Sequence, residues 1–338
     1  MPYIHSNYIL YLYSLWKTVS KASIHSRRFE ILKAMNKMKS NPISALCIVL
    51  LILLGHNILA QNNAETTSLA VDPIIWNVWP DEAPGEEKKL EPEYDTTKPD
   101  GELVAGQRVI RLTNVSVPQL AIYKPNPALD THTTVVIAPG GGHQIIAYDL
   151  EGTEVAAWFN SIGVTAIILK YRVPGAVRNK GVRWMAAAQD GQRAMSLVRS
   201  RANEIGIDPN KLGIIGFSAG GTPVKYTALT SKRLYEPVDQ HDEASFRPDF
   251  AAPIYTSGLP KEAEVNENCP PFFMVVTNDD FGPIMMAEMY IALKKANVSA
   301  EFHIYESGGH GYGLRATELP VTSWPDRMEE WMKRLGFL

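Results

Sequence analysis

Short apolar runs alternate with segments of helical periodicity from Thr133 to the end of this 338-residue chain. The first run, at residues 134–137, is rich in β-branched residues, which is typical of a buried strand. Strands that alternate with helices form βαβ units, and these build a mainly parallel sheet with helices on both faces. The alternation therefore predicts an α/β fold. The predicted strands cover residues 134–137, 164–169, 211–215, 250–255, 272–276 and 300–305, and the predicted helices cover residues 155–162, 187–205, 286–297 and 324–335.

The sequence near the N-terminus has the three parts of a secretory signal. Lysines precede an unbroken apolar run at residues 45–54, and Ala60 follows as the small residue of a cleavage site. This run is too short for a spanning helix, which needs about 20 apolar residues. We therefore predict a signal peptide region over residues 1–60, with Met35 or Met38 as the true start. The mature protein is expected to be exported to the periplasm or the extracellular space; an uncleaved anchor is the competing interpretation.

The rest of the chain reads as a single domain with an extended lead-in. Residues 61–105 are rich in Pro, Glu, Asp and Gly, and we expect little regular structure there. Residues 108–123 contain strand-like stretches broken by Pro118, which favours edge strands. We therefore predict an α/β domain over residues 106–338.

Charge and cysteine content narrow the function classes. The first 60 residues hold seven of the 33 Lys and Arg and one of the 36 acidic residues, so the remainder carries a net charge of −9. A chain this acidic is a poor candidate for binding nucleic acid or an anionic membrane surface. Cys47 lies in the predicted signal region, so the mature chain would keep Cys269 alone and could form no intramolecular disulfide. No Cys/His cluster has zinc spacing, and we expect no metal or cofactor.

The sequence Gly216-Phe217-Ser218-Ala219-Gly220 has the Gly-x-Ser-x-Gly pattern of a nucleophile elbow. In an elbow the serine occupies a strained turn between a strand and a helix, and small neighbours let the chain pack through it. A predicted strand ends just before this pattern and a helix can start just after it. An ordinary glycine-rich βα turn is the alternative interpretation. The context favours Ser218 as a nucleophile.

A serine nucleophile needs a base, which we expect after the last strand. In α/β hydrolases the order along the chain is Ser, then Asp or Glu, then His. His310 lies in a glycine-rich loop just beyond residues 300–305, as a general base should. The other histidines fit less well, because His303 falls inside the predicted strand and His241 and His132 lie in polar connections.

The orienting acid should follow the strand at residues 272–276, where Asp279 and Asp280 are adjacent. Either carboxylate could hold His310 in its reactive tautomer and stabilise the imidazolium. We favour Asp280, since the acid of this fold usually lies a few residues past the strand end, and we keep Asp279 as the alternative.

Backbone amides of a glycine loop could bind the oxyanion of an acyl-transfer reaction. Pro139-Gly140-Gly141-Gly142 follows the first predicted strand and resembles the His-Gly-Gly-Gly loop of lipases and esterases. We assign the donors to Gly141, Gly142 and Ala219. A tight βα turn is the structural alternative, and a phosphate loop is disfavoured because no Gly-Lys-Ser/Thr follows.

Four charged residues precede the nucleophile strand on a predicted helix: Asp190, Arg193, Arg199 and Arg201. Surface pairs or a buried ion pair are the preferred interpretation of this group, rather than catalysis.

Several segments together resemble a family of exported bacterial α/β hydrolases that includes acetylxylan esterase-like and feruloyl esterase-like (BD-FAE-like) enzymes, some of them labelled xylanases. The similarity runs from about Trp76 to the C-terminus. The matching segments are residues 79–80, 83–85, 138–142, 151–152, 169–172, 189–194, 207–209, 216–221, 247–250 and 308–313.

The resemblance implies a single-domain α/β-hydrolase fold and a serine esterase that removes acetyl groups from plant polysaccharide such as xylan. Its partners would be small esters or acylated oligosaccharides. The chain looks unlike true xylanases, which use two carboxylates for catalysis. The alternatives are a serine peptidase of the same fold and a non-catalytic carbohydrate-binding homologue.

The sequence departs from the family pattern at two places near the predicted site. Thr222 stands where similar proteins often have His after the elbow, and His143 stands where an aromatic residue commonly follows the glycines. These departures bear on the substrate more than on the mechanism.

Overall fold

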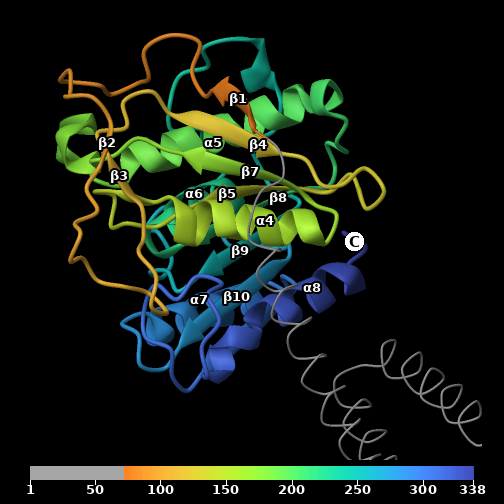
Figure 1. Cartoon of the computed structure of the whole chain (residues 1–338). Helices are drawn as coiled ribbons and strands as arrows, with labels where there is room; N and C mark the ends of the chain where they lie inside the picture. The colour runs from red at the N-terminus through yellow and green to blue at the C-terminus, as the bar shows by residue number, and fades with distance from the viewer. Residues whose placement is uncertain (1–71) are drawn as a thin grey trace, which may run out of the picture. The chain divides into compact units, whose positions relative to one another are not determined.

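The computed structural model describes residues 72–338, and its main element is an eight-stranded sheet with the order β1-β4-β7-β5-β8-β9-β10-β11 (Figure 1). The antiparallel strand β4 runs against its two neighbours, and all pairs from β7 to β11 are parallel. The bounds in this order are β1 (Ile74–Asn77), β4 (Gln119–Tyr123), β7 (Thr165–Lys170), β5 (Thr134–Ala138), β8 (Leu212–Phe217), β9 (Phe250–Ile254), β10 (Phe272–Thr277) and β11 (Ala300–Tyr305).

The central strands are buried along their whole length. Every residue of β5, β8, β9 and β10 is buried, as expected for parallel strands covered on both faces. This explains why the sequence shows continuous apolar runs there rather than alternation. The α/β architecture predicted from those runs is confirmed.

In the part of the chain that the structure describes, five α-helices cover the sheet: α4 (Glu154–Ser161), α5 (Met185–Ser200), α6 (Gly221–Ala228), α7 (Pro283–Lys295) and α8 (Trp324–Arg334). Figure 1 shows α4 and α8 on one face, with α5 and α6 on the other. The ring of Trp158 in α4 lies 6.3 Å from that of Trp324 in α8. The short helices are η1 (Asp149–Thr153), η2 (Gly175–Val177), η3 (Asn179–Gly181), η4 (Ala202–Ile205), η5 (Ser218–Gly220), η6 (Gln240–Glu243) and η7 (Pro320–Ser323).

The segment before residue 106 contains more regular structure than the sequence indicates. β1 pairs with β4 and forms the outer strand of the main sheet, so the sheet begins at Ile74 rather than within residues 106–338. β4 is consequently an interior strand and not an edge strand. Pro118 precedes β4 by one residue, so its missing N–H removes no donor from the strand.

A second, small sheet has the order β2-β3-β6, with bounds β2 (Tyr94–Asp95), β3 (Arg111–Thr113) and β6 (Ile146–Ala147). Its pairs are antiparallel. Because β6 follows the glycine loop after β5, this sheet holds the far end of that loop. The predicted signal region, residues 1–60, lies outside the described residues. Within residues 72–338, no helix is both long and apolar enough to cross a membrane.

Candidate active site

Ser218 stands at the turn between β8 and α6, as the elbow pattern predicts. Its φ is 51°, in the left-handed region that a non-glycine residue rarely adopts. The flanking glycines make this turn sterically feasible. A Cβ on Gly216 would lie 2.1 Å from the Gly220 carbonyl oxygen, and a Cβ on Gly220 would lie 1.9 Å from the Ala138 carbonyl oxygen. The elbow therefore packs directly on the end of β5.

His310 contacts Ser218 from the loop that follows β11. Its Nε2 lies 2.8 Å from Ser218 Oγ, and 34% of its side chain is exposed. The loop is anchored at its start, because Thr277 Oγ1 donates to the Gly309 carbonyl at 2.7 Å. The structure thus brings together two residues that are 92 positions apart in the chain.

Asp280 and Asp279 have different partners. Both carboxylate oxygens of Asp280 lie 3.0 Å from His310 Nδ1, and its side chain is fully buried. Asp279 instead accepts the N–H groups of Gly309 at 2.9 Å and Gly308 at 3.2 Å. These hydrogen bonds, that of Gly309 first, lower the pKa of the exposed Asp279 carboxyl. One aspartate contacts the imidazole, and its neighbour holds the loop that carries it.

The glycine loop after β5 lies against the elbow. A Cβ on Gly140 would be 2.9 Å from the Cβ of Ser218, so only glycine allows this approach. Gly140 donates its own N–H to Glu151 Oε2 at 2.6 Å. Among the described residues, no acceptor takes the N–H of Gly141 or Gly142. These two amides and that of Ala219, which follows Ser218 directly, are the candidate donors to an oxyanion.

Glu151 is the residue of the site to which sequence reasoning gave no role. It is buried in η1 with 3% exposure, and its Oε1 accepts the hydroxyl of Tyr255 at 2.7 Å. The one sequence signal for Glu151 is that it lies in a segment, residues 151–152, that resembles the esterase family. No motif spacing connects it to Ser218, so its place in the site could not be predicted from the residues themselves.

Three basic side chains border the same loops: His143, Lys225 and Arg183. Burial lowers the pKa of His143 to about 4, with the charges of Arg183 and Lys225 acting in the same direction. Burial also lowers the pKa of Lys225 to about 8, and its Nζ donates to Ser257 and Gly258 oxygens at 2.7–3.0 Å. Arg183 donates to the Gly142 carbonyl at 2.9 Å.

The charged residues of α5 have structural partners away from Ser218. Asp190 is fully buried and pairs with Arg172 Nε at 2.9 Å, and it also accepts Trp79 Nε1 at 2.8 Å. Arg193 pairs with Asp239 at 2.6 Å. Arg199 pairs with Asp249, and Arg201, which directly follows α5, pairs with Glu204.

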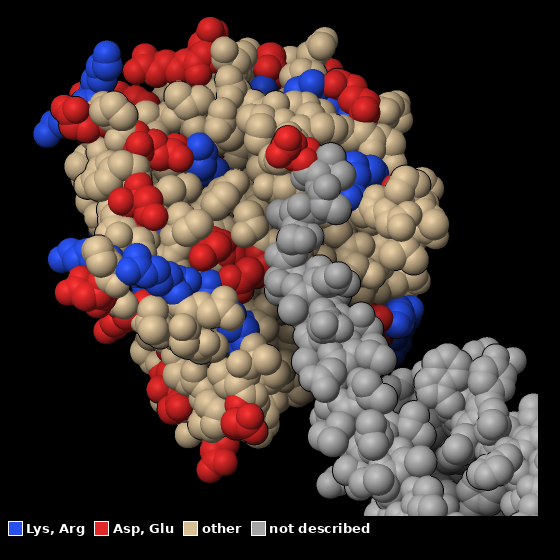
Figure 2. Space-filling model, viewed as in Figure 1, with Lys and Arg blue, Asp and Glu red and all other residues tan. Residues whose placement is uncertain are grey.

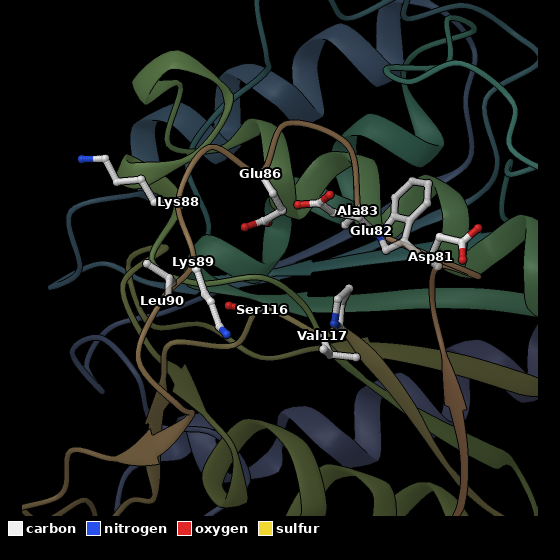
Figure 3. Close-up of a pocket in the computed structure, with 11 residues that line it drawn as sticks. Asp81, Glu82, Ala83, Glu86, Lys88, Lys89, Leu90, Ser116 and Val117 are labelled. Carbon is white, nitrogen blue, oxygen red and sulfur yellow. The ribbon is translucent and has the colours of Figure 1, made fainter.

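A cavity of about 400 Å³ lies apart from these residues (Figure 3). It is bordered by the segment after β1 and the turn before β4, and its lining includes Trp79, Glu86 and Lys89. The lining contains neither Ser218 nor His310, and Glu86 is engaged by Arg172 and Arg178. We therefore place the chemistry at the elbow and not in this cavity.

Acidic and basic side chains are interspersed on the face shown in Figure 2. That face offers no continuous basic track of the kind that binds a phosphate backbone. Within residues 72–338, no group of three or more His, Cys, Asp or Glu is arranged to hold a metal ion. Cys269 is a free, buried thiol.

Comparison with known proteins gives one family and two curated relatives. The BD-FAE family model matches residues 120–258. An acetylxylan esterase of Xylanibacter ruminicola is 25% identical over 228 residues, which are 61% of this chain and 46% of that protein. Endo-1,4-beta-xylanase B of Butyrivibrio fibrisolvens is 25% identical over 223 residues, 58% of this chain and 34% of that protein. The chain spans less than half the length of both relatives.

Solved structures show the same fold. An acetyl ester-xyloside bifunctional hydrolase from Caldicellulosiruptor lactoaceticus superposes with a TM-score of 0.60 at 25% identity, covering 80% of this chain and 99% of that one. A thermophilic esterase of Thermogutta terrifontis, with propionate bound, gives a TM-score of 0.58 at 22% identity and covers 72% and 95%. The predicted α/β-hydrolase fold is confirmed by these likenesses.

Proposed function

We propose a mechanism for this chain on the basis that it belongs to the BD-FAE-like family of α/β-hydrolase esterases. The proposed reaction is hydrolysis of a carboxylic ester by two-step acyl transfer. The observation that carries it is the position of the His310 imidazole, with Ser218 Oγ 2.8 Å from one nitrogen and the Asp280 carboxylate 3.0 Å from the other.

In the first step Ser218 Oγ attacks the ester carbonyl while His310 Nε2 takes its proton. Asp280 accepts Nδ1–H, which selects the tautomer with a free Nε2 and stabilises the imidazolium. The amides of Gly141, Gly142 and Ala219 bind the oxyanion. The tetrahedral intermediate collapses as His310 protonates the leaving alcohol. Water, deprotonated by His310, then attacks the acyl-serine and releases the carboxylic acid.

The substrate we propose is an acetylated plant polysaccharide such as xylan, or a small ester of the same kind. Names of relatives support this choice, since one is an acetylxylan esterase and another an acetyl ester-xyloside hydrolase. The surface beside the imidazole supports it too. The ring of Phe281 lies 4.8 Å from that of His310, and 62% of this residue is exposed, which leaves an apolar face for a sugar ring.

The export of the protein remains a proposal from the sequence alone. If the signal is cleaved as proposed, the protein recovered from the periplasm or the medium should start after the apolar run at residues 45–54. N-terminal sequencing tests this, and a protein recovered in the membrane fraction with that run intact would favour an uncleaved anchor.

The test of the activity is hydrolysis of acetylated xylan and of aryl acetates by the wild-type protein and by Ser218→Ala. We expect acetate release by the wild type and a loss of roughly 10⁴-fold or more in kcat for the variant. Peptide substrates and xylan-binding assays run in parallel. Cleavage of peptides alone would favour a peptidase, and binding of xylan without hydrolysis would favour a non-catalytic homologue.

A further inference from the structure

Glu151 is a buried acid that the acyl-transfer mechanism does not use. Only 3% of Glu151 is exposed, yet no cationic side chain among the described residues lies within 4.0 Å of its carboxylate. Burying an unpaired carboxylate is costly unless hydrogen bonds to both oxygens compensate. Here both oxygens face donors, with Gly140 N–H at 2.6 Å from Oε2 and the Tyr255 hydroxyl at 2.7 Å from Oε1.

The Gly140 contact fixes the entry to the proposed oxyanion loop. Gly140 directly precedes Gly141 and Gly142, and its carbonyl accepts Ala147 N–H at 3.0 Å. Both polar groups of Gly140 are therefore held. Because both polar groups of Gly140 are hydrogen-bonded, the N–H of the next residue, Gly141, has little freedom to move. This N–H is one of the candidate oxyanion donors.

The Tyr255 contact leads to the loop of the base. Tyr255 is fully buried just after β9, and its hydroxyl oxygen accepts Gly313 N–H at 3.2 Å. Its ring lies 5.1 Å from the His310 ring in an edge-on arrangement. One carboxylate thus connects to the loop of the oxyanion donors directly and to the loop of His310 through one phenol.

The donors around Glu151 fit a carboxylate better than an amide. An ionised carboxylate only accepts hydrogen bonds, whereas the NH₂ group of a glutamine would face one of the two donors. Burial raises the pKa of Glu151, and the hydrogen bonds from the Tyr255 hydroxyl and the Gly140 amide offset this rise only in part. In its ionised form, Glu151 would also favour the imidazolium that His310 forms during each acyl-transfer step.

We propose that Glu151 is a positioning residue that holds the oxyanion loop and the His310 loop in register with each other. This inference rests on the proposed ester hydrolysis and extends it to a fourth side chain that does not touch the substrate. Its effect should appear in the transition state, since the position of the oxyanion donors matters more there than in the bound ester.

The test compares wild type with Glu151→Gln in the full chain, using an aryl acetate and a boronic acid that forms a tetrahedral adduct with the serine. We expect kcat to fall about 10- to 100-fold, less than the 10²–10³ for a deleted oxyanion donor, with KM nearly unchanged. Affinity for the boronic acid should fall by the same factor as kcat. A merely structural role would lower the melting temperature without this parallel.

Glu301→Gln is the matched control. Glu301 also accepts two side-chain hydrogen bonds, from His303 and Arg334, but it lies near the start of β11, at the opposite end of the sheet. We expect wild-type kcat and boronic acid affinity for this variant.

If Glu151→Gln fails to fold, Tyr255→Phe decides, because it removes the hydroxyl and keeps the buried ring. It should also lower kcat and boronic acid affinity together. The inference is overturned if Glu151→Gln folds, or Tyr255→Phe is used in its place, and both kcat and boronic acid affinity stay at the wild-type values. The proposed function would still stand in that case. A wild-type protein that is inert on every ester overturns both.

Discussion

Nε2 of His143 lies 3.1 Å from Oγ1 of Thr222, so the two departures from the family pattern contact each other. His143 belongs to the glycine loop and Thr222 to the first turn of α6. The contact places an imidazole of the glycine loop directly against the start of α6.

The depressed pKa of His143 predicts a loss of stability in acid. Its imidazole has a pKa of about 4 in the folded protein against an ordinary value of 6.5. As the pH falls through this window the unfolded chain takes up the proton first, so folding stability decreases. This group should remove about 2 kcal/mol between pH 7 and pH 5. Urea unfolding at both pH values measures the difference.

His143→Asn is the comparison for that measurement, since asparagine tolerates the φ of 57° at this position. The variant lacks the titrating group, and its loss between pH 7 and pH 5 should be smaller than that of the wild type. Equal losses in the two proteins would show that His143 does not carry the effect.

The two adjacent aspartates should differ in their effect on catalysis. Asp280→Asn removes the carboxylate that contacts Nδ1 of His310, and we expect kcat to fall by about 10³–10⁴. Asp279→Asn keeps an oxygen that can accept the Gly309 and Gly308 amides, so kcat should fall about tenfold or less. Steady-state kinetics on an aryl acetate distinguishes them, and a reversed order would reassign the orienting acid.

Gly220→Ala should destabilise the fold, because its Cβ would lie 1.9 Å from the Ala138 carbonyl oxygen. We expect a loss of about 1–3 kcal/mol or more in the free energy of unfolding, with a loss of activity. Gly152→Ala is the control, since its nearest neighbour would be 3.5 Å from the new Cβ. Chemical denaturation of both variants tests the claim, which fails if they unfold at the same midpoint.

Phe281 should contribute to the binding of a sugar and not to the chemical step. Phe281→Ala removes an exposed ring beside His310, and covering that ring is worth about 1–2 kcal/mol. KM for acetylated xylo-oligosaccharides should therefore rise roughly tenfold, while the kinetics on methyl acetate stay the same. Ile291→Ala, an exposed apolar position further along α7, is the control. Equal effects on both substrates would remove Phe281 from the sugar site.

The sequence is sufficient to predict the central sheet and the places of two residues of the candidate site, for identifiable reasons. The parallel strands are buried on both faces, so their apolar runs are continuous and easily read. Ser218 stands in a turn that requires Gly216 and Gly220, which leaves a visible pattern. His310 follows the last strand in the order that the fold demands.

Other features depend on contacts that no local pattern records. β1 has a partner more than 40 residues later in the chain, and only Trp76 of its four residues is buried, so its short segment resembles a loop. Asp279 and Asp280 follow the same strand, and only the path of the His310 loop separates their partners. Glu151 meets Tyr255 across 104 residues.

The N-terminal strand also determines where the chain can be shortened. β1 covers one side of β4, the Val78 carbonyl accepts Arg193 Nε at 3.0 Å, and Trp79 donates to the buried Asp190. A recombinant fragment that started at residue 106 would leave the outer edge of β4 unpaired. It would also remove one hydrogen-bond partner each from the buried Arg193 and Asp190. A fragment that retains Ile74 keeps this edge closed.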